Sequence, residues 1–205
     1  MSNLKQAIKQ NYVKCAKDPS YFINEFCVIQ HPQRGKIKFK LYPYQYDVLE
    51  EFETHDYNVV LKSRQLGIST LTAAYSLWLM LFHADKNVLC IATTKDTAKN
   101  LVTKVRIMYE GLPNWLKTAI VENNKLSLIF KNGSQIKAIA SNESAGRSEA
   151  LSLLILDEAA FIDKIDRIWT AAQQTLATGG RCIGISTPNG VGNLFTPSLA
   201  STQVL

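Results

Sequence analysis

The residues best suited to chemistry begin with a short loop at positions 59–70, VVLKSRQLGIST. A β-branched run comes first, a polar segment with one glycine follows, and small hydroxyl residues open a helical pattern. This order is typical of a loop that binds phosphate between a buried strand and a helix N-terminus. The loop departs from the pattern G-x-x-x-x-G-K-[ST], because Lys62 replaces the first glycine and Ile68 replaces the lysine. The loop alone is therefore a weak signal, and its assignment depends on whether other segments supply the remaining residues of a nucleotide-hydrolysing site.

Within the loop, several residue types suit the binding of a nucleotide. Gly67 leaves room for backbone N–H groups to face phosphate, and Ser69 offers a hydroxyl to a magnesium ion. Ile68 cannot neutralise phosphate charge, whereas Lys62 and Arg64 can. We predict that Lys62 takes the place of the missing lysine, with Arg64 as the alternative. The other nucleotide-binding residues predicted in the loop are Ser63, Gln65 and Thr70.

Two adjacent carboxylates, Asp157 and Glu158, follow the apolar run LSLLIL. Adjacent side chains at the end of a strand diverge, so two separate roles suit them better than one shared role. We predict that Asp157 lies near magnesium and that Glu158 orients or deprotonates a water that attacks the γ-phosphate. An exposed acidic turn is the alternative for this pair.

Four further residues fit a nucleotide site by type and position. Ser186 and Thr187 open the turn STPNG and could sense a γ-phosphate, although turn chemistry alone favours a turn without a ligand. Gln45 lies in the first turn of a predicted helix, where its amide could pair with the edge of an adenine. Considered without the other segments, this residue would be interpreted as a surface glutamine. Arg147, in a glycine-bearing loop, is a candidate arginine finger directed at a neighbouring subunit, or a surface arginine.

The elements that must position these residues alternate between strands and helices. Residues 1–40 read as a partly basic, helical lead-in with a short exposed strand at 35–40, and Asn132 with Gly133 predicts a hairpin. The alternation predicts an α/β fold with a mainly parallel sheet, helices on both faces, and polar strand ends that converge at one edge. The predicted strands are 58–61, 87–93, 125–130, 135–140, 151–156 and 182–186, and the predicted helices are 43–52, 69–82, 94–109 and 165–176.

The composition, 46% hydrophobic and 20% charged, is that of a globular protein. A net charge of +6 permits a polyanionic partner, but the basic residues are spread out and suit a solvated surface equally well. Four cysteines without a C-x-x-C pair and three isolated histidines argue against a zinc or disulfide framework, and we expect Cys90 and Cys182 in the core. We expect a cytoplasmic, reduced protein, because no signal core or membrane-spanning run is present.

In combination these segments resemble the N-terminal ATPase part of the large terminase subunit of tailed double-stranded-DNA bacteriophages. The resemblance covers roughly residues 18–195. It implies a RecA-like, additional-strand P-loop ATPase domain at 41–195, which assembles as a ring on the portal of an empty prohead and pumps DNA inward with ATP. The segments that carry it are LYPYQYDVLEEF (41–52), VVLKSRQLGIST (59–70), LLILDEAAFID (153–163) and ISTPNGVGN (185–193).

The resemblance also implies roles and partners. Some large terminases carry their lysine at the first loop position, as Lys62 would. The implied partners are double-stranded DNA, the portal protein and the small terminase subunit, in the host cytoplasm. By matched position, Gln45 reads adenine, Ser69 and Asp157 hold Mg²⁺, Glu158 is the catalytic carboxylate, and Ser186 and Thr187 form the coupling motif.

The end of the chain departs from this family. Large terminases continue into a ribonuclease-H-like nuclease domain, but no acidic residue follows Asp166, and the tail at 196–205 is uncharged. We therefore expect no nuclease activity from this chain. A split gene, an interrupted reading frame or a truncated product would each account for this, and in the first case a separate nuclease half would be a further partner. Two alternatives stay open: a superfamily-2-like helicase or translocase, and a non-catalytic, truncated remnant that binds nucleotide or partner subunits, which Ile68 and the missing half suggest.

Overall fold

The structure is a computed structural model that describes residues 2–141 and 150–190. Arg147 and the tail at 196–205 lie outside the described residues. In chain order the elements are α1 (Ser2–Lys17), α2 (Pro19–Phe26), β1 (Val28–His31), β2 (Gly35–Lys38), α3 (Pro43–Thr54), β3 (Tyr57–Leu61), α4 (Ile68–Phe82), β4 (Asn87–Ala92), α5 (Lys95–Gly111), η1 (Asn114–Leu116), β5 (Ile120–Asn123), β6 (Ser127–Phe130), β7 (Gln135–Ala140), β8 (Leu153–Asp157), η2 (Ala159–Phe161), α6 (Ile165–Leu176) and β9 (Arg181–Ser186).

A seven-stranded sheet lies at the centre, with its strands in the order β3-β9-β8-β4-β7-β6-β5. The strands from β3 to β7 pair in parallel, and β6 and β5 continue the sheet antiparallel. The predicted mainly parallel sheet is therefore confirmed. The predicted hairpin joins β6 to β7, and Gly133 in its turn has a φ of 83°, which glycine adopts without steric cost.

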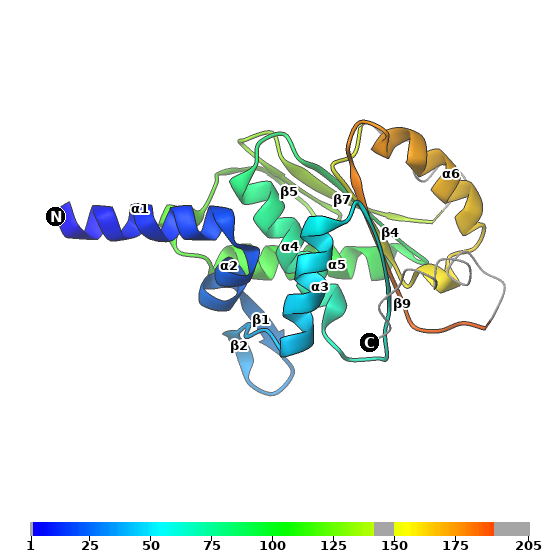
Figure 1. The fold of residues 1–205 in the computed structure, drawn as a ribbon, viewed down its shortest axis with the longest axis horizontal. Helices are drawn as coiled ribbons and strands as arrows, with labels where there is room; N and C mark the ends of the chain where they lie inside the picture. The colour runs from blue at the N-terminus through cyan, green and yellow to red at the C-terminus, as the bar shows by residue number, and fades with distance from the viewer. Residues whose placement is uncertain (1, 142–149, 191–205) are drawn as a thin grey trace.

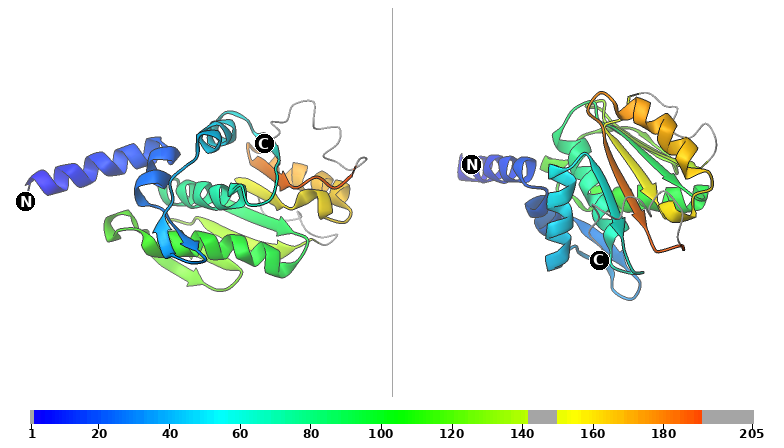
Figure 2. Two further views of the ribbon diagram at one scale, coloured as in Figure 1. Left: turned by 90° about the horizontal axis from the view of Figure 1, so that it is seen from below. Right: turned by 45° about the vertical axis from the view of Figure 1, so that its right-hand side comes forward.

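Helices cover both faces of the sheet, as predicted (Figures 1 and 2). On one face, α4 packs against α5 and also contacts α3. The helix α4 is buried on almost every side, which explains its nearly continuous apolar sequence. On the other face, α6 places Ile165, Ile168, Ala172 and Leu176 against the apolar side chains of β4 and β8. Cys90 and Cys182 are buried in the strands, as predicted.

The N-terminal segment contains two helices and a two-stranded hairpin, β1–β2. Most of α1 extends away from the sheet (Figure 2), while its end is anchored where Trp78 Nε1 donates to the Cys15 carbonyl at 2.7 Å. Phe22 and Ile23 of α2 are fully buried in the same core cluster as α4, so α2 packs as part of the main core. No helix in the described ranges is long and apolar enough to cross a membrane.

Candidate active site

Polar residues from three neighbouring strands meet at the carboxyl edge of the sheet. Lys62 follows β3, Ser186 ends β9, and Asp157 ends β8, and these strands are adjacent in the order β3-β9-β8. The backbone N–H of Lys62 donates to the Ser186 carbonyl at 3.0 Å. Lys62 Nζ lies 3.3 Å from Glu158 Oε1. The structure thus brings together the loop, the acidic pair and the Ser-Thr turn.

The loop between β3 and α4 is held by two side chains of α3. The Tyr44 hydroxyl donates to the Leu66 carbonyl at 2.8 Å, and Gln45 Nε2 donates to the same oxygen at 3.1 Å. These bonds direct the carbonyl toward α3, so its negative end does not repel an anion in the loop. The N-terminus of α4, with its partial positive charge, follows directly at Ile68. The backbone N–H groups at the start of α4 can therefore bind a phosphate held in the loop.

Gln45 is 1% exposed, and its amide oxygen accepts the Tyr42 N–H at 3.1 Å. The residue therefore contacts backbone through both ends of its amide, and it joins the start of α3 to the phosphate loop. Its adenine-reading role stays a prediction. Gly67 lies directly beneath it with a φ of 72°, and a Cβ at Gly67 would lie 3.0 Å from Gln45 Nε2. Both the backbone conformation and the space favour glycine here.

The position that carries lysine in the usual pattern points into the core. Ile68 is fully buried in the main hydrophobic cluster, between the sheet and the neighbouring helices. A lysine in this orientation would bury an ammonium group without a partner, at high cost. Lys62 instead directs its ammonium toward Glu158 at the carboxyl edge. Of the other predicted loop residues, Ser63, Arg64 and Gln65 are exposed and Thr70 is half-buried.

Ser69 and Asp157 form a pair of oxygen donors below the loop. The Ser69 hydroxyl donates to Asp157 Oδ1 at 3.1 Å, and Asp157 is 7% exposed. Burial raises the pKa of Asp157, while the Ser69 hydrogen bond and the positive charge of Lys104 oppose this. A hydroxyl and a carboxylate suit Mg²⁺, which usually takes its remaining ligands from water and nucleotide phosphates. Among the described residues, no group of three or more acidic, histidine or cysteine side chains could hold a metal ion.

Glu158 adopts the left-handed conformation, with φ 52° and ψ 46°, which is uncommon for a residue other than glycine. Its Oε2 accepts from the Thr187 backbone N–H at 3.3 Å and from the Thr187 hydroxyl at 3.2 Å. Ser186 is fully buried. Its hydroxyl oxygen accepts a hydrogen bond from the Ala160 N–H at 3.0 Å, and its O–H donates to the Thr187 carbonyl at 2.9 Å. The strained backbone and these bonds hold the Glu158 carboxylate beside the end of β9.

Two residues of this region escaped the sequence analysis. Tyr44 donates a hydrogen bond to the phosphate loop. Its position next to Gln45 in the sequence was the feature that could have indicated a role at the site. Lys104 of α5 lies close enough to Asp157 for their charges to interact, while burial lowers the pKa of its ammonium. Lys104 follows Leu101 by three residues and precedes Met108 by four, which places it beside the apolar stripe of its helix. A lysine beside the buried stripe of a helix could have predicted that Lys104 is partly buried.

Comparison with known proteins identifies related sequences and folds. Residues 59–200 match the family described as terminase large subunit, T4likevirus-type, N-terminal. A variant of the large terminase ATPase domain of Thermus phage P74-26 is similar over 77% of this chain and 68% of its own length, with 24% identity and a TM-score of 0.61.

Two further solved structures share the fold at lower identity. The large terminase of bacteriophage HK97 matches 90% of this chain with 20% identity and a TM-score of 0.68, and the chain spans 40% of its length. The UvsW helicase of bacteriophage T4 matches 92% of this chain and 66% of its own, with 10% identity and a TM-score of 0.60. These likenesses confirm the predicted RecA-like α/β fold.

Proposed function

The chain belongs to the family of terminase large subunits of the T4-like type, as an N-terminal part, and we propose that it is the ATP-hydrolysing motor domain that drives double-stranded DNA into a prohead. The observation that most supports this proposal is the chain of contacts from Lys62 through Glu158 to Thr187. It joins the phosphate loop, the acidic strand end and the end of β9 in one cluster.

In this proposal the loop and the acidic strand hold Mg²⁺–ATP together. Lys62 neutralises charge on the β- and γ-phosphates, while backbone N–H groups at the start of α4 face their oxygens. Ser69 and Asp157 hold Mg²⁺, which supplies further charge neutralisation to the phosphates. Gln45 lies next to the loop and reads the adenine edge. The exposed loop residues Ser63, Arg64, Gln65 and the half-buried Thr70 complete the nucleotide contacts.

Glu158 acts as the general base. A γ-phosphate competes with the Glu158 carboxylate for the Lys62 ammonium, because both anions lie within reach of one cation. Glu158 then loses the contact to Lys62 but keeps its two hydrogen bonds to Thr187. From this fixed position it accepts a proton from the attacking water. Arg147 of a neighbouring subunit supplies positive charge to the transition state.

The Ser186–Thr187 turn carries the result of hydrolysis to the rest of the domain. Thr187 contacts the catalytic carboxylate, while Ser186 contacts the backbone of both Lys62 and Ala160. Loss of the γ-phosphate restores the Lys62–Glu158 contact. This changes the surroundings of Ser186 and Thr187, which are hydrogen-bonded to Lys62 and Glu158. The end of β9 is thereby coupled to the nucleotide state.

The proposed partners follow from the packaging reaction. They are double-stranded DNA, the portal protein, the small terminase subunit, further copies of the chain in a ring, and a separate nuclease half, with Mg²⁺ and ATP as cofactors. The proposed place of action is the host cytoplasm, at the prohead portal.

The direct test is the Glu158→Gln variant. We expect magnesium-dependent ATP hydrolysis to fall by about 100-fold or more, because the general base is lost while the side chain keeps its shape. Binding of a fluorescent ATP analogue should remain. Glu50→Gln, on the exposed face of α3, is the matched control and should hydrolyse ATP normally. Unchanged turnover in Glu158→Gln would remove the basis of the proposal. A wild-type protein that binds but does not hydrolyse ATP, with DNA and a nuclease half supplied, would support the non-catalytic alternative.

A helicase or translocase is the second candidate, because the fold also matches a phage helicase over 92% of this chain. The two functions differ in what the motor requires. A packaging motor should show DNA translocation only with portal and prohead present, whereas a helicase should separate strands of a labelled duplex without them. Strand separation by the chain alone would favour the helicase.

A further inference from the structure

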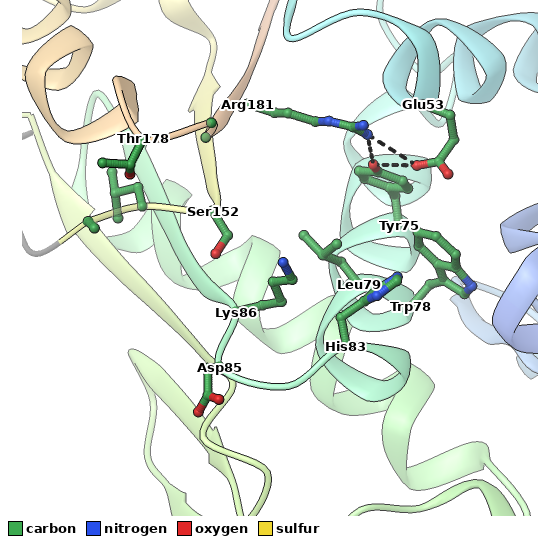
Figure 3. Close-up of a pocket in the computed structure, with 14 residues that line it drawn as sticks. Glu53, Tyr75, Trp78, Leu79, His83, Asp85, Lys86, Ser152, Thr178 and Arg181 are labelled. Atoms are coloured by element: carbon green, nitrogen blue, oxygen red, sulfur yellow. Dashed lines mark hydrogen bonds and ion pairs between the residues drawn. The ribbon is translucent and has the colours of Figure 1, made fainter.

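A cavity of about 450 Å³ lies at the amino edge of the sheet, opposite the candidate active site. Its walls come from the end of α3, the middle of α4, the α4–β4 connection, and the segments that lead into β8 and β9 (Figure 3). Its size suits a small ligand. None of the residues that line it takes part in the proposed ATPase reaction, so its chemistry can be considered separately.

One wall of the cavity is a fixed polar network around Arg181. Its Nη1 donates to the Phe52 carbonyl at 2.9 Å and to the Tyr75 hydroxyl at 3.0 Å, and it lies 3.4 Å from Glu53 Oε1. The Tyr75 hydroxyl donates to Glu53 at 2.6 Å. Arg181 offsets the charge of Glu53, and its Nε also lies 3.9 Å from Oδ1 of the exposed Asp56, so this wall adds no net positive charge of its own.

Lys86 lies outside this network and adds a positive charge to the cavity. Within the described residues, its ammonium makes no hydrogen bond or ion pair, and Figure 3 shows the side chain extending into the cavity near Ser152 and Leu79. Asp85 points away from it in the same view. The Ser152 hydroxyl oxygen accepts the Asn87 N–H at 3.1 Å, so its own hydrogen is available to a ligand.

His83 senses the charge inside the cavity. Burial lowers the pKa of its imidazole, and the positive charges of Lys86 and Arg181 lower it further, whereas Glu53 raises it. The imidazole thus lies among two cations and one carboxylate. An anion that binds the Lys86 ammonium would remove one of the charges that lower the His83 pKa and would therefore change the titration of His83.

We propose that this cavity is a second phosphate-binding site, in which Lys86 and the Ser152 hydroxyl contact the phosphate oxygens beside the Arg181 wall. A phosphate group matches the combination of a free ammonium and a hydroxyl donor, while the guanidinium of Arg181 is already engaged in the wall. The cavity is larger than one phosphate, so the group is carried by a larger ligand. A free nucleotide and the backbone of a DNA strand offer the same chemistry. The inference does not depend on ATP hydrolysis at the opposite edge.

The test follows the ring resonances of His83 by NMR while inorganic phosphate is added to the full chain. We expect a saturable shift and a higher His83 pKa, because a bound anion favours the imidazolium form. Lys86→Gln should weaken phosphate binding by about 10-fold or more, through loss of a charge-assisted hydrogen bond. Lys86→Arg, which keeps the charge, should retain binding. Lys125→Gln, an exposed lysine at the β5–β6 turn, is the matched control and should bind as the wild type does.

A second set of titrations identifies the source of the phosphate. A shift with a mononucleotide but not with a 20-base-pair duplex supports the site with a free nucleotide as ligand. A shift with the duplex that Lys86→Gln weakens supports it with DNA as ligand. In Lys62→Met, the His83 response should persist, because the phosphate loop lies at the other edge. No saturation at His83 with any of these probes, or equal affinity in Lys86→Gln and the wild type, overturns the proposal.

Discussion

The assignment of the loop lysine can be tested by changing Lys62 and Ile68 in parallel. Lys62 is 7% exposed and directs its ammonium at Glu158, whereas Ile68 is fully buried among apolar side chains. Lys62→Met removes the charge and keeps most of the length of the side chain. Ile68→Ala keeps the charge pattern of the loop and removes apolar contacts from the core. The two variants should therefore fail in different ways.

The structure sets the expected magnitudes. Loss of one preorganised cationic contact to the transition state costs about 100- to 1,000-fold in turnover. The Glu158 side chain that Lys62→Met leaves unpaired is 33% exposed, so water can solvate it and stability should change by no more than about 1 kcal/mol. Ile68→Ala should instead cost roughly 2–5 kcal/mol of unfolding free energy. For a chain of this length, this lowers the Tm by about 2–4 °C per kcal/mol.

The assay combines phosphate release, at a temperature where all variants are folded, with thermal unfolding followed by circular dichroism. Lys62→Met should lose turnover at a nearly unchanged Tm, and Ile68→Ala should lose Tm while its folded fraction hydrolyses ATP. Ile68→Val, which removes one methylene, is the milder control for the core position. If Lys62→Met keeps a tenth or more of wild-type turnover, the lysine has been placed wrongly. Equal losses of turnover in Lys62→Met and Ile68→Ala would refute the same reasoning.

Two further predictions concern buried features of the site. Burial raises the pKa of Asp157 above its ordinary value of 3.8, so the stability this carboxyl contributes is present below that pH and is lost as pH rises through the folded pKa. Asp157→Asn should therefore match the wild type in Tm near pH 3.5 and have a higher Tm than the wild type at pH 7, while losing magnesium-dependent hydrolysis; a lower Tm at pH 7 would contradict this. Gly67→Ala should cost roughly 1–2 kcal/mol through its left-handed backbone and weaken ATP binding by crowding Gln45. Gly35→Ala, with φ 69° and open space around it, is the control: equal ATP affinity in both variants would show that the loop tolerates the methyl group.

Sequence patterns predicted the sheet because its central strands are long apolar runs with few alternatives. The segment 135–140 forms β7 with the expected bounds, and the helix expected at 165–176 forms α6. Two strands were missed. β1 pairs only with β2, and β5 is a short edge strand in which Val121 is 70% exposed. Such strands carry little apolar pattern, because they bury little surface.

The geometry of the site was less accessible to sequence. The order of the motifs predicted that Lys62 and Glu158 would share one edge, because the ends of parallel strands converge. Their contact, and the left-handed backbone of Glu158, depend on packing that no local pattern encodes. The same holds for Gln45, whose amide contacts the loop backbone. Long-range hydrogen bonds of this kind join residues that lie far apart in the chain, so they are visible only in three dimensions.

The strand that carries the phosphate loop lies at the edge of the sheet within the described part of the chain. Its backbone pairs with β9 alone, and β9 is the strand that ends in the Ser186–Thr187 turn. The hydrogen bond from Lys62 N–H to the Ser186 carbonyl is the last rung of this ladder. A shift at the end of β9 therefore reaches the loop through one row of hydrogen bonds, while β8 holds β9 from its other side. Because β3 has no other strand partner in the described part of the chain, it can follow a movement of β9 without breaking a second row of hydrogen bonds.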